Sequence, residues 1–185
     1  MKELSLNILD IAENSVKAEA TLIEILITES AGTLEISIKD NGKGMSEETV
    51  RSVTDPFYTT RTTRRVGLGI PLFKFAAEQT GGKFTIESLE RKDGTENHGT
   101  TVTARFYTDH IDFTPLGDVI STLVTLIQGH PSIDFVFIHR TDCGTVELDT
   151  RVLRGVLEDT PLDTFEVLVW IKENLEGQYE VISKK

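Results

Sequence analysis

A carboxylate that continues the buried face of a strand is the feature that most constrains this sequence. Apolar residues alternate with polar ones from Leu34 to Ile38, and Asp40 follows at the same parity, so it points to the buried side. A carboxylate there is costly unless it accepts hydrogen bonds. An adenine amino group is one suitable donor, and Gly42 and Gly44 would let the backbone approach a flat ligand closely. The alternative is a strand-ending turn, because Asp-Asn-Gly is a common turn sequence.

The periodicity around this strand favours an α+β fold. Helical spacing of apolar residues predicts helices over 4–18 and 71–79, and alternation or β-branched residues predict strands over 22–29, 34–38, 84–88 and 101–106. The first two strands, joined by a short turn, are expected to form an antiparallel hairpin. The order of helix, two strands, irregular stretch, helix and two strands predicts a two-layer α/β sandwich, with helices on one face of a mixed, mostly antiparallel sheet.

The second part of the chain is predicted to be a small, acidic α+β extension. Residues 1–109 carry 17 acidic and 13 basic side chains, whereas residues 110–185 carry 13 and 6. We therefore divide the chain into 1–109 and 110–185. Helices are expected over 116–127, 149–157 and 162–175, with strands over 133–138 and 146–148. Val167, Leu168, Trp170 and Ile171 are expected to form the core of this extension, whose role the sequence leaves unknown.

Charge and composition exclude several classes of protein. The 185 residues include 30 acidic and 19 basic side chains, a net charge of −11, which would repel duplex DNA, so no nucleic-acid partner is expected. No apolar run is long enough for a membrane span, and the N-terminus lacks the pattern of a secretory signal. The single cysteine, Cys143, excludes an internal disulfide and fits a cytoplasmic location.

Three polar residues share one face of the first predicted helix. Asp10 and Asn14 are four residues apart and Lys17 follows three residues later, so their side chains lie on nearly the same side. A carboxylate and an amide oxygen stacked in this way suit a hard cation such as Mg²⁺ with its waters. The alternative is a polar helix face in contact with solvent.

A positively charged stretch precedes the second predicted helix. Arginines and threonines are concentrated between residues 55 and 65, without apolar periodicity, which is typical of a functional lid or of a solvated loop. Gly67-Leu68-Gly69 then opens the helix, where free N–H groups and the helix dipole favour a phosphate. The pattern is neither a dinucleotide-binding fingerprint nor a Walker A loop.

These motifs, in this order and followed by Gly99-Thr100, resemble the ATP-binding domain of the GHKL superfamily, which includes gyrase, histidine kinases and MutL. The resemblance covers roughly residues 1–107 and implies a Bergerat fold that binds ATP and Mg²⁺. It implies that Asn14 ligates Mg²⁺, that Lys17 contacts a phosphate and that Asp40 binds the adenine amino group. Further implied contacts are the base pocket (Gly42, Gly44, Met45, Thr100), the lid (Phe57, Thr59, Thr60, Arg61) and the phosphate turn (Gly67, Leu68, Gly69).

The sequence departs from the resembled families at three points. Asp10 occupies the place of a glutamate that orients water in the ATPase members, and its shorter side chain argues against efficient hydrolysis. Arg65 replaces a glycine that is usual in histidine kinases. We expect no helical hairpin with a phosphorylatable histidine before Leu4, and we expect the four histidines, which follow the first nucleotide motifs, to be ordinary surface or core residues (His98, His110, His130, His139).

The resemblance therefore favours a cytoplasmic ATP-Mg²⁺-binding regulatory protein, a protein kinase that acts on a separate partner, similar to the small serine kinases that bind sigma factors. Asp10 would be its catalytic residue and would orient the incoming hydroxyl. One alternative is a non-catalytic ATP sensor. Another is a weak ATPase of the MutL or gyrase type, for which residues 110–185 are too short and too acidic. A homodimer is left open.

Overall fold

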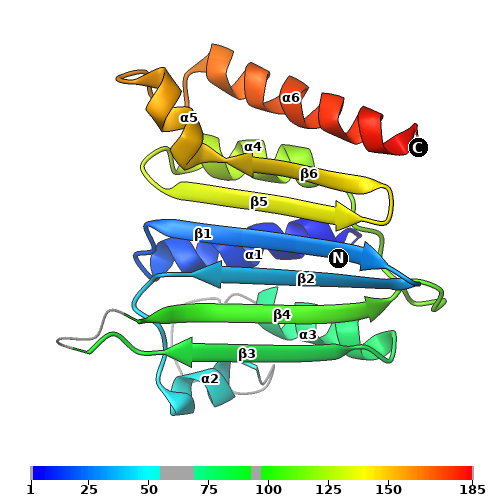
Figure 1. The fold of residues 1–185 in the computed structure, drawn as a ribbon. Helices are drawn as coiled ribbons and strands as arrows, with labels where there is room; N and C mark the ends of the chain where they lie inside the picture. Colours follow the sequence, from blue (N-terminus) through cyan, green and yellow to red (C-terminus); the bar gives the residue numbers. More distant parts are fainter. Residues whose placement is uncertain (1, 55–68, 93–96, 185) are drawn as a thin grey trace.

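The fold is a six-stranded sheet with its main helices on one face (Figure 1). The computed structural model describes residues 2–54, 69–92 and 97–184. Its helices are α1 (Leu4–Lys17), α2 (Glu47–Val53), α3 (Gly69–Gln79), α4 (Val119–Gly129), α5 (Thr150–Leu157) and α6 (Phe165–Ser183). Its strands are β1 (Leu22–Ser30), β2 (Thr33–Asp40), β3 (Lys83–Leu89), β4 (Gly99–Tyr107), β5 (Asp134–Thr141) and β6 (Gly144–Asp149). The predicted α+β class is confirmed.

The sheet has the strand order β3-β4-β2-β1-β5-β6. The β1 and β2 strands form the expected antiparallel hairpin, and β4 pairs antiparallel with both β2 and β3. In the β2–β4 register, Asp40 lies opposite Thr100. Two motifs that are 60 residues apart in the sequence are therefore neighbours at one end of the sheet.

Residues beyond 110 continue the same sheet. The β5 strand pairs in parallel with β1, from Leu22 opposite Asp134 to Thr28 opposite Arg140. The β6 strand then pairs antiparallel with β5 and forms the edge. The backbone of β6 is held by α6, because the side-chain amide of Gln178 accepts from the Glu147 N–H at 2.8 Å and donates to the Glu147 carbonyl at 3.0 Å.

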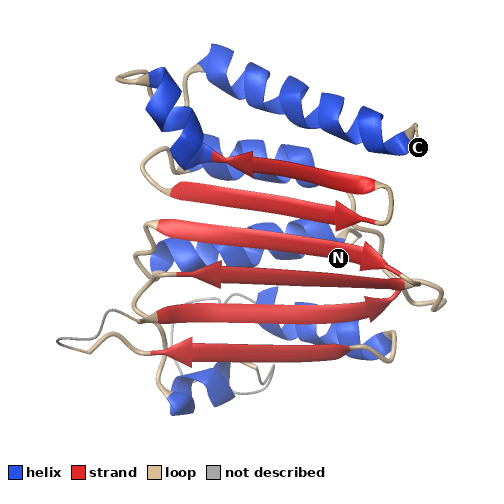
Figure 2. Ribbon diagram, viewed as in Figure 1, coloured by secondary structure: helices blue, strands red, loops and turns tan. Residues whose placement is uncertain are grey.

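The core lies between the sheet and the helices α1, α3 and α4, which Figure 2 shows behind the strands. Alternate residues of β1 and β2 face these helices and are almost fully buried (Ile23, Ile25, Ile27, Leu34, Ile36, Ile38). The helices contribute apolar stripes to the same core, for example Leu4, Ile8 and Ile11 of α1. Burial of this stripe fixes the rotation of α1 about its axis, and with it the direction of the polar face that contains Asp10 and Asn14.

Three predictions about local structure were wrong or incomplete. The short helix α2 was not predicted, because none of its residues is buried and it has no apolar stripe to detect; Ser46 caps it by accepting from the Thr49 N–H. The last helix extends to Ser183, well beyond residue 175. Trp170 is not a core residue, since half of its surface is exposed, whereas Val167, Leu168 and Ile171 are buried as expected.

Within residues 2–54, 69–92 and 97–184, no helix combines the length and apolar character that crossing a membrane requires.

Candidate functional site

A cavity of about 310 Å³ lies between α1, the segment after β2, α2, the start of α3 and β4. Both apolar and polar or charged residues line it, which is usual for a small-molecule site. The polar or charged lining residues are Asn14, Ser15, Lys17, Asp40, Lys43 and Thr100, and the remaining ones are Ile11, Ala18, Ile38, Gly44, Met45, Val53, Ile70 and Val102. Six of the predicted site residues therefore line the same cavity: Asn14, Lys17, Asp40, Gly44, Met45 and Thr100.

Asp40 is the most constrained polar residue of this cavity. Only 8% of its surface is exposed. One carboxylate oxygen, Oδ1, accepts from the Gly42 N–H at 2.8 Å and from the Thr100 N–H at 3.2 Å. The other, Oδ2, accepts from the Ser15 hydroxyl at 2.7 Å. A carboxylate offers about four acceptor sites, so three donors leave one acceptor for a further group in the cavity.

The segment that follows Asp40 is held by hydrogen bonds on several sides. The Asn41 side-chain oxygen accepts from the Thr21 and Leu22 N–H groups, at 2.8 and 2.9 Å. The Gly42 carbonyl oxygen lies 2.7 Å from Nδ1 of His98. Since a carbonyl can only accept, this histidine carries its proton on Nδ1. The segment is thus fixed against α1, β1 and the start of β4.

Glycine is required where this segment contacts its neighbours. Gly44 has a φ of +66°, and a methyl group there would overlap the Leu89 carbonyl oxygen. At Gly42 a methyl group would lie 2.7 Å from the Ala18 carbonyl oxygen. Both glycines therefore allow a close approach of backbone segments around the cavity.

A hydroxyl network supports the Met45 and Thr100 side of the cavity. The Ser88 hydroxyl accepts from the Met45 N–H at 2.8 Å and lies 2.8 Å from the Thr100 hydroxyl. It also lies 3.1 Å from the Gly99 carbonyl oxygen, to which it can donate. These contacts link β3, β4 and the segment after β2, so that Thr100 is held both by its backbone and by its side chain.

The polar face of α1 is divided between the cavity and the start of α3. Asn14 and Lys17 line the cavity, whereas Asp10 does not. Asp10 is exposed and packs against Gly69, where a methyl group would lie 2.8 Å from its Cβ atom. Lys17 and Lys43 outnumber the single lining carboxylate, Asp40. The cavity is therefore locally cationic in a chain whose net charge is −11, which favours an anionic ligand.

Several predicted site residues lie outside the described part of the chain: Phe57, Thr59, Thr60, Arg61, Gly67 and Leu68. Of the predicted phosphate turn the structure places only Gly69, the first residue of α3, beside Asp10.

Sequence reasoning missed part of the cavity. Ser15 had been assigned to the apolar stripe of the first helix, yet it donates to Asp40. A small hydroxyl residue four positions after Ile11, on a face that is otherwise apolar, was the available signal. Val53 and Ile70 also line the cavity, and Val53 lies on the unpredicted α2. Lys43 also lines the cavity, and its position in the sequence between Gly42 and Gly44 gave no indication of this.

The residues present fit a magnesium ion that arrives with a nucleotide. Among the residues that the structure describes, no group of three or more histidine, cysteine or acidic side chains could hold a metal ion by itself. Asn14 offers one amide oxygen at the cavity. Mg²⁺ commonly keeps several waters and binds through few protein ligands together with substrate phosphates. One amide ligand on α1 is compatible with that mode.

Two solved structures have a similar fold. The N-terminal domain of a DNA repair protein superposes with a TM-score of 0.55 and 18% identity, covering 80% of this chain and 52% of that chain. The Aquifex aeolicus MutL ATPase domain complexed with ADP gives a TM-score of 0.53 and 15% identity, covering 100% of this chain and 98% of that chain. At this identity the likeness concerns the fold.

Sequence relatives are found among bacterial kinases. The chain is 32% identical over 71 residues to the sensor histidine kinase ZraS of Escherichia coli, and 30% identical over 90 residues to sporulation kinase C of Bacillus subtilis. These matches cover 38% and 48% of this chain, but only 15% and 20% of the two relatives. The chain thus spans a fifth or less of their length.

A family model of histidine kinase-, DNA gyrase B-, and HSP90-like ATPases matches residues 2–110. This segment contains every residue of the cavity, and it makes up more than half of the chain. The chain belongs to the histidine kinase-, DNA gyrase B-, and HSP90-like ATPase family.

Proposed function

We propose that this protein binds ATP with Mg²⁺ in the cavity and transfers the γ-phosphoryl group to a separate partner protein, as a regulatory protein kinase. In this proposal residues 1–109 form the nucleotide-binding unit and residues 110–185 an extension of it. Family membership and the kinase relatives support the nucleotide and the reaction class.

The main support for the proposal is that the Asp40 carboxylate has one hydrogen-bond acceptor position left after its three donors within the protein. Its carboxylate is buried, and three donors from Ser15, Gly42 and Thr100 fix both oxygens. The acceptor that remains at the cavity would take a hydrogen from the exocyclic amino group of adenine. A guanine or hypoxanthine base would instead present a carbonyl oxygen at that point, and two acceptors would repel each other. The site thus favours adenine.

The phosphates would lie toward the cationic side of the cavity. Asn14 would hold the Mg²⁺ that accompanies the nucleotide, and Lys17 would contact a phosphate. Lys43, which also lines the cavity, is a second candidate for a phosphate contact. When bound, the ion would neutralise charge that develops on the phosphates during transfer.

Asp10 would act on the nucleophile. It is exposed, one helical turn before Asn14, and it lies beside the first residue of α3. From this place its carboxylate would orient a partner hydroxyl and accept its proton while the hydroxyl oxygen bonds to the γ-phosphorus. The bond between that phosphorus and the β–γ bridging oxygen then breaks, and ADP leaves with the electron pair.

A second candidate is a weak ATPase, and the observation that favours it is the exposure of Asp10. A carboxylate open to solvent could orient water as readily as a hydroxyl group of a partner. The whole-chain fold likeness to a MutL ATPase domain agrees with this alternative at the level of the fold.

One experiment separates these functions. The protein is incubated with γ-labelled Mg-ATP, first alone and then with a lysate of its own organism. Label that appears on another protein supports the kinase, release of inorganic phosphate without transfer supports the ATPase, and binding without turnover supports the sensor. Asp10→Asn should abolish transfer while ATP still binds, and Glu78→Gln on the exposed surface of α3 is the matched control. Transfer that survives in the Asp10 variant would contradict its assignment.

A further inference from the structure

The extension after residue 110 carries an exposed apolar surface that the described fold does not cover. Large apolar side chains on its two last helices have between 36% and 77% of their surface exposed: Val152 and Val156 on α5, and Phe165, Val169 and Trp170 on α6. Single exposed apolar residues are common on proteins, but a contiguous group marks an interaction site. We call these five residues the α5–α6 surface.

A groove of about 380 Å³ is part of this surface. Its floor is formed by Val136 and Ile138 of β5, and its walls by Val152 and Leu153 of α5 and by Trp170 of α6. In this region α6 runs along the β6 edge, as Figure 1 shows. The groove is open, so a bulky apolar side chain from another molecule can enter it between the two helices.

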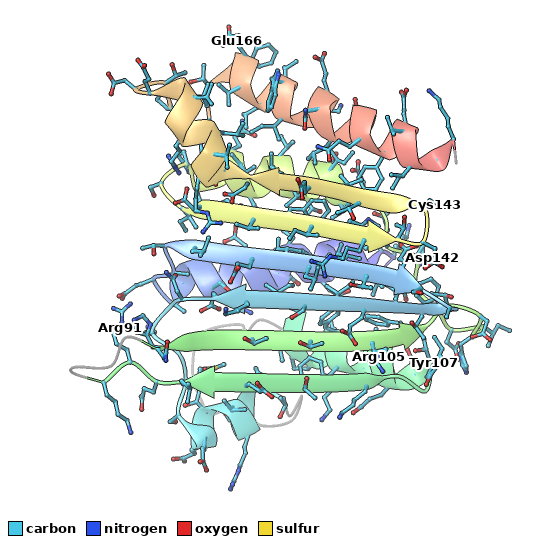
Figure 3. The ribbon with its side chains drawn as sticks, in the orientation of Figure 1. Arg91, Arg105, Tyr107, Asp142, Cys143 and Glu166 are labelled. Atoms are coloured by element: carbon cyan, nitrogen blue, oxygen red, sulfur yellow. The ribbon has the colours of Figure 1, made fainter. Side chains whose placement is uncertain are left out.

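Acidic side chains lie in the groove and near it on α6. Glu147 and Asp149 line the groove. Glu166 and Glu173 precede and follow Trp170 by four and three residues, so they lie about one helical turn on either side of it. Figure 3 shows Glu166 on the first turn of α6, pointing away from the sheet. Among the described residues, no ion pair involves Glu147, Glu166 or Glu173.

Three cations of α5 and α6 pair with other carboxylates. Arg151 pairs with Asp149 at 2.7 Å, Arg154 with Asp134 at 2.7 Å, and Lys172, which adjoins Glu173, with Glu176 at 3.8 Å. The glutamates around the groove are therefore free to attract a cation from outside. Residues 110–185 as a whole carry 13 acidic and 6 basic side chains, which adds to the negative potential at this end of the molecule.

We infer that the α5–α6 surface binds a segment of a different protein, in which a bulky apolar side chain is flanked by lysine or arginine. The apolar residue would fill the groove beside Trp170. The flanking cations would pair with Glu147 inside the groove and with the exposed Glu166 and Glu173 on the outer side of α6. A symmetric contact with a second copy of this chain would instead bring the same glutamates together, and like charges at an interface oppose association.

Selection from a random peptide library displayed on phage tests this inference on the full chain. Peptides that combine an aromatic or branched aliphatic residue with flanking lysine or arginine should be enriched. Binding of a synthetic copy should change the fluorescence of Trp170, the only tryptophan of the chain. Replacing its basic residues by glutamate should weaken binding about tenfold or more.

Two sets of variants sharpen the test. Val156→Ser with Phe165→Ser should abolish the enrichment, and the fold should survive because both side chains are about three-quarters exposed. Reversing the three glutamates (E147K, E166K, E173K) should invert the preference toward acidic peptides. The control E48K, E78K, E87K changes the net charge equally on exposed residues elsewhere and should leave the preference unchanged.

Three results would overturn the inference. The first is an absence of enriched peptides that depend on the α5–α6 surface. The second is enrichment without a preference for basic residues. The third is a dimer, seen by sedimentation, that dissociates in the Val156 and Phe165 double variant, since the occupant would then be a second copy of this chain. Retained Mg-ATP binding in every variant separates these results from a failure of the nucleotide site.

Discussion

Replacing Asp40 by asparagine should reverse the hydrogen-bonding character of the base pocket while keeping the fold. The asparagine carbonyl can take the place of Oδ1 and still accept from the N–H groups of Gly42 and Thr100. Its NH₂ group then replaces Oδ2 and can donate to the Ser15 hydroxyl, which is able to accept. The local network survives, but the free site at the cavity becomes a donor.

The magnitude follows from the chemistry of that one contact. A hydrogen bond to a charged acceptor contributes about 1.5–3 kcal/mol, which corresponds to a roughly ten- to hundredfold loss in ATP affinity. The new donor also faces the adenine amino group, which is itself a donor. Inosine triphosphate carries a carbonyl at that position and should therefore bind the variant better than ATP does.

Calorimetric titration with Mg-ATP and Mg-ITP measures both affinities, and thermal unfolding provides the second readout. At a hundredfold excess over the dissociation constant, ATP should stabilise the unmodified protein by about 2.7 kcal/mol, and at the same ATP concentration the variant should lose about 1.3–2.3 kcal/mol of this. Asn41→Asp is a control that changes charge at the next residue without facing the cavity. Unchanged ATP affinity together with an unchanged ATP to ITP ratio would refute the assignment of Asp40.

Three further perturbations test the surroundings of the site and the fold. Ser15→Ala removes the donor to Asp40 and should weaken Mg-ATP binding several-fold, by about 0.5–1.5 kcal/mol, in the same titration. Gly44→Ala combines a left-handed backbone with a steric overlap and should lower the free energy of unfolding by more than about 2 kcal/mol, measured in urea. Nε2 of His139 lies 3.3 Å from a carboxylate oxygen of Glu29, and this contact lowers the pKa of Glu29. The carboxylate therefore stabilises the fold above its ordinary pKa of 4.5, and this contribution is lost as the pH falls through the lowered value. Glu29→Gln should therefore flatten the acid side of a plot of melting temperature against pH.

Matched variants distinguish these causes. Ser15→Thr keeps the hydroxyl, so binding as weak as that of Ser15→Ala would show that the donor is not what matters. Gly32 also has a positive φ but open space around it, so Gly32→Ala reports the backbone strain alone. An equal loss at Gly32 and Gly44 would exclude the steric contribution. If the melting temperature of Glu29→Gln falls as steeply toward acid pH as that of the unmodified protein, the role of Glu29 is contradicted.

The spacing of apolar residues correctly predicted the helices and strands that bury one apolar face. The apolar stripe from Leu4 to Ile11 and the alternation of Leu34, Ile36 and Ile38 each specify an element and its buried side. The parity of Asp40 followed from the same alternation, and the structure indeed places it at 8% exposure. The short helix α2 was not predicted because none of its residues is buried and its start is marked only by the Ser46 cap.

Contacts between distant segments could not be read from spacing. The hydrogen bond from Ser15 to Asp40 joins a helix to a strand 25 residues later, and it depends on how far α1 is rotated and shifted over the sheet. Pairing of β5 with β1 depends on a long crossover through α4, for which the sequence has no local signal. The prediction that Trp170 is a core residue was wrong because helical periodicity identifies an apolar stripe but does not show whether another element covers it.

The parallel pairing of β5 with β1 has a consequence for anyone who dissects this chain. A fragment that stops at residue 109 would keep every cavity residue, yet it would expose the N–H and C=O groups of β1 that β5 now pairs between Leu22 and Thr28. Bare strand edges of this kind recruit other chains. Precipitation or filament growth of such a fragment would thus reflect the lost neighbour and not a defect of the nucleotide pocket.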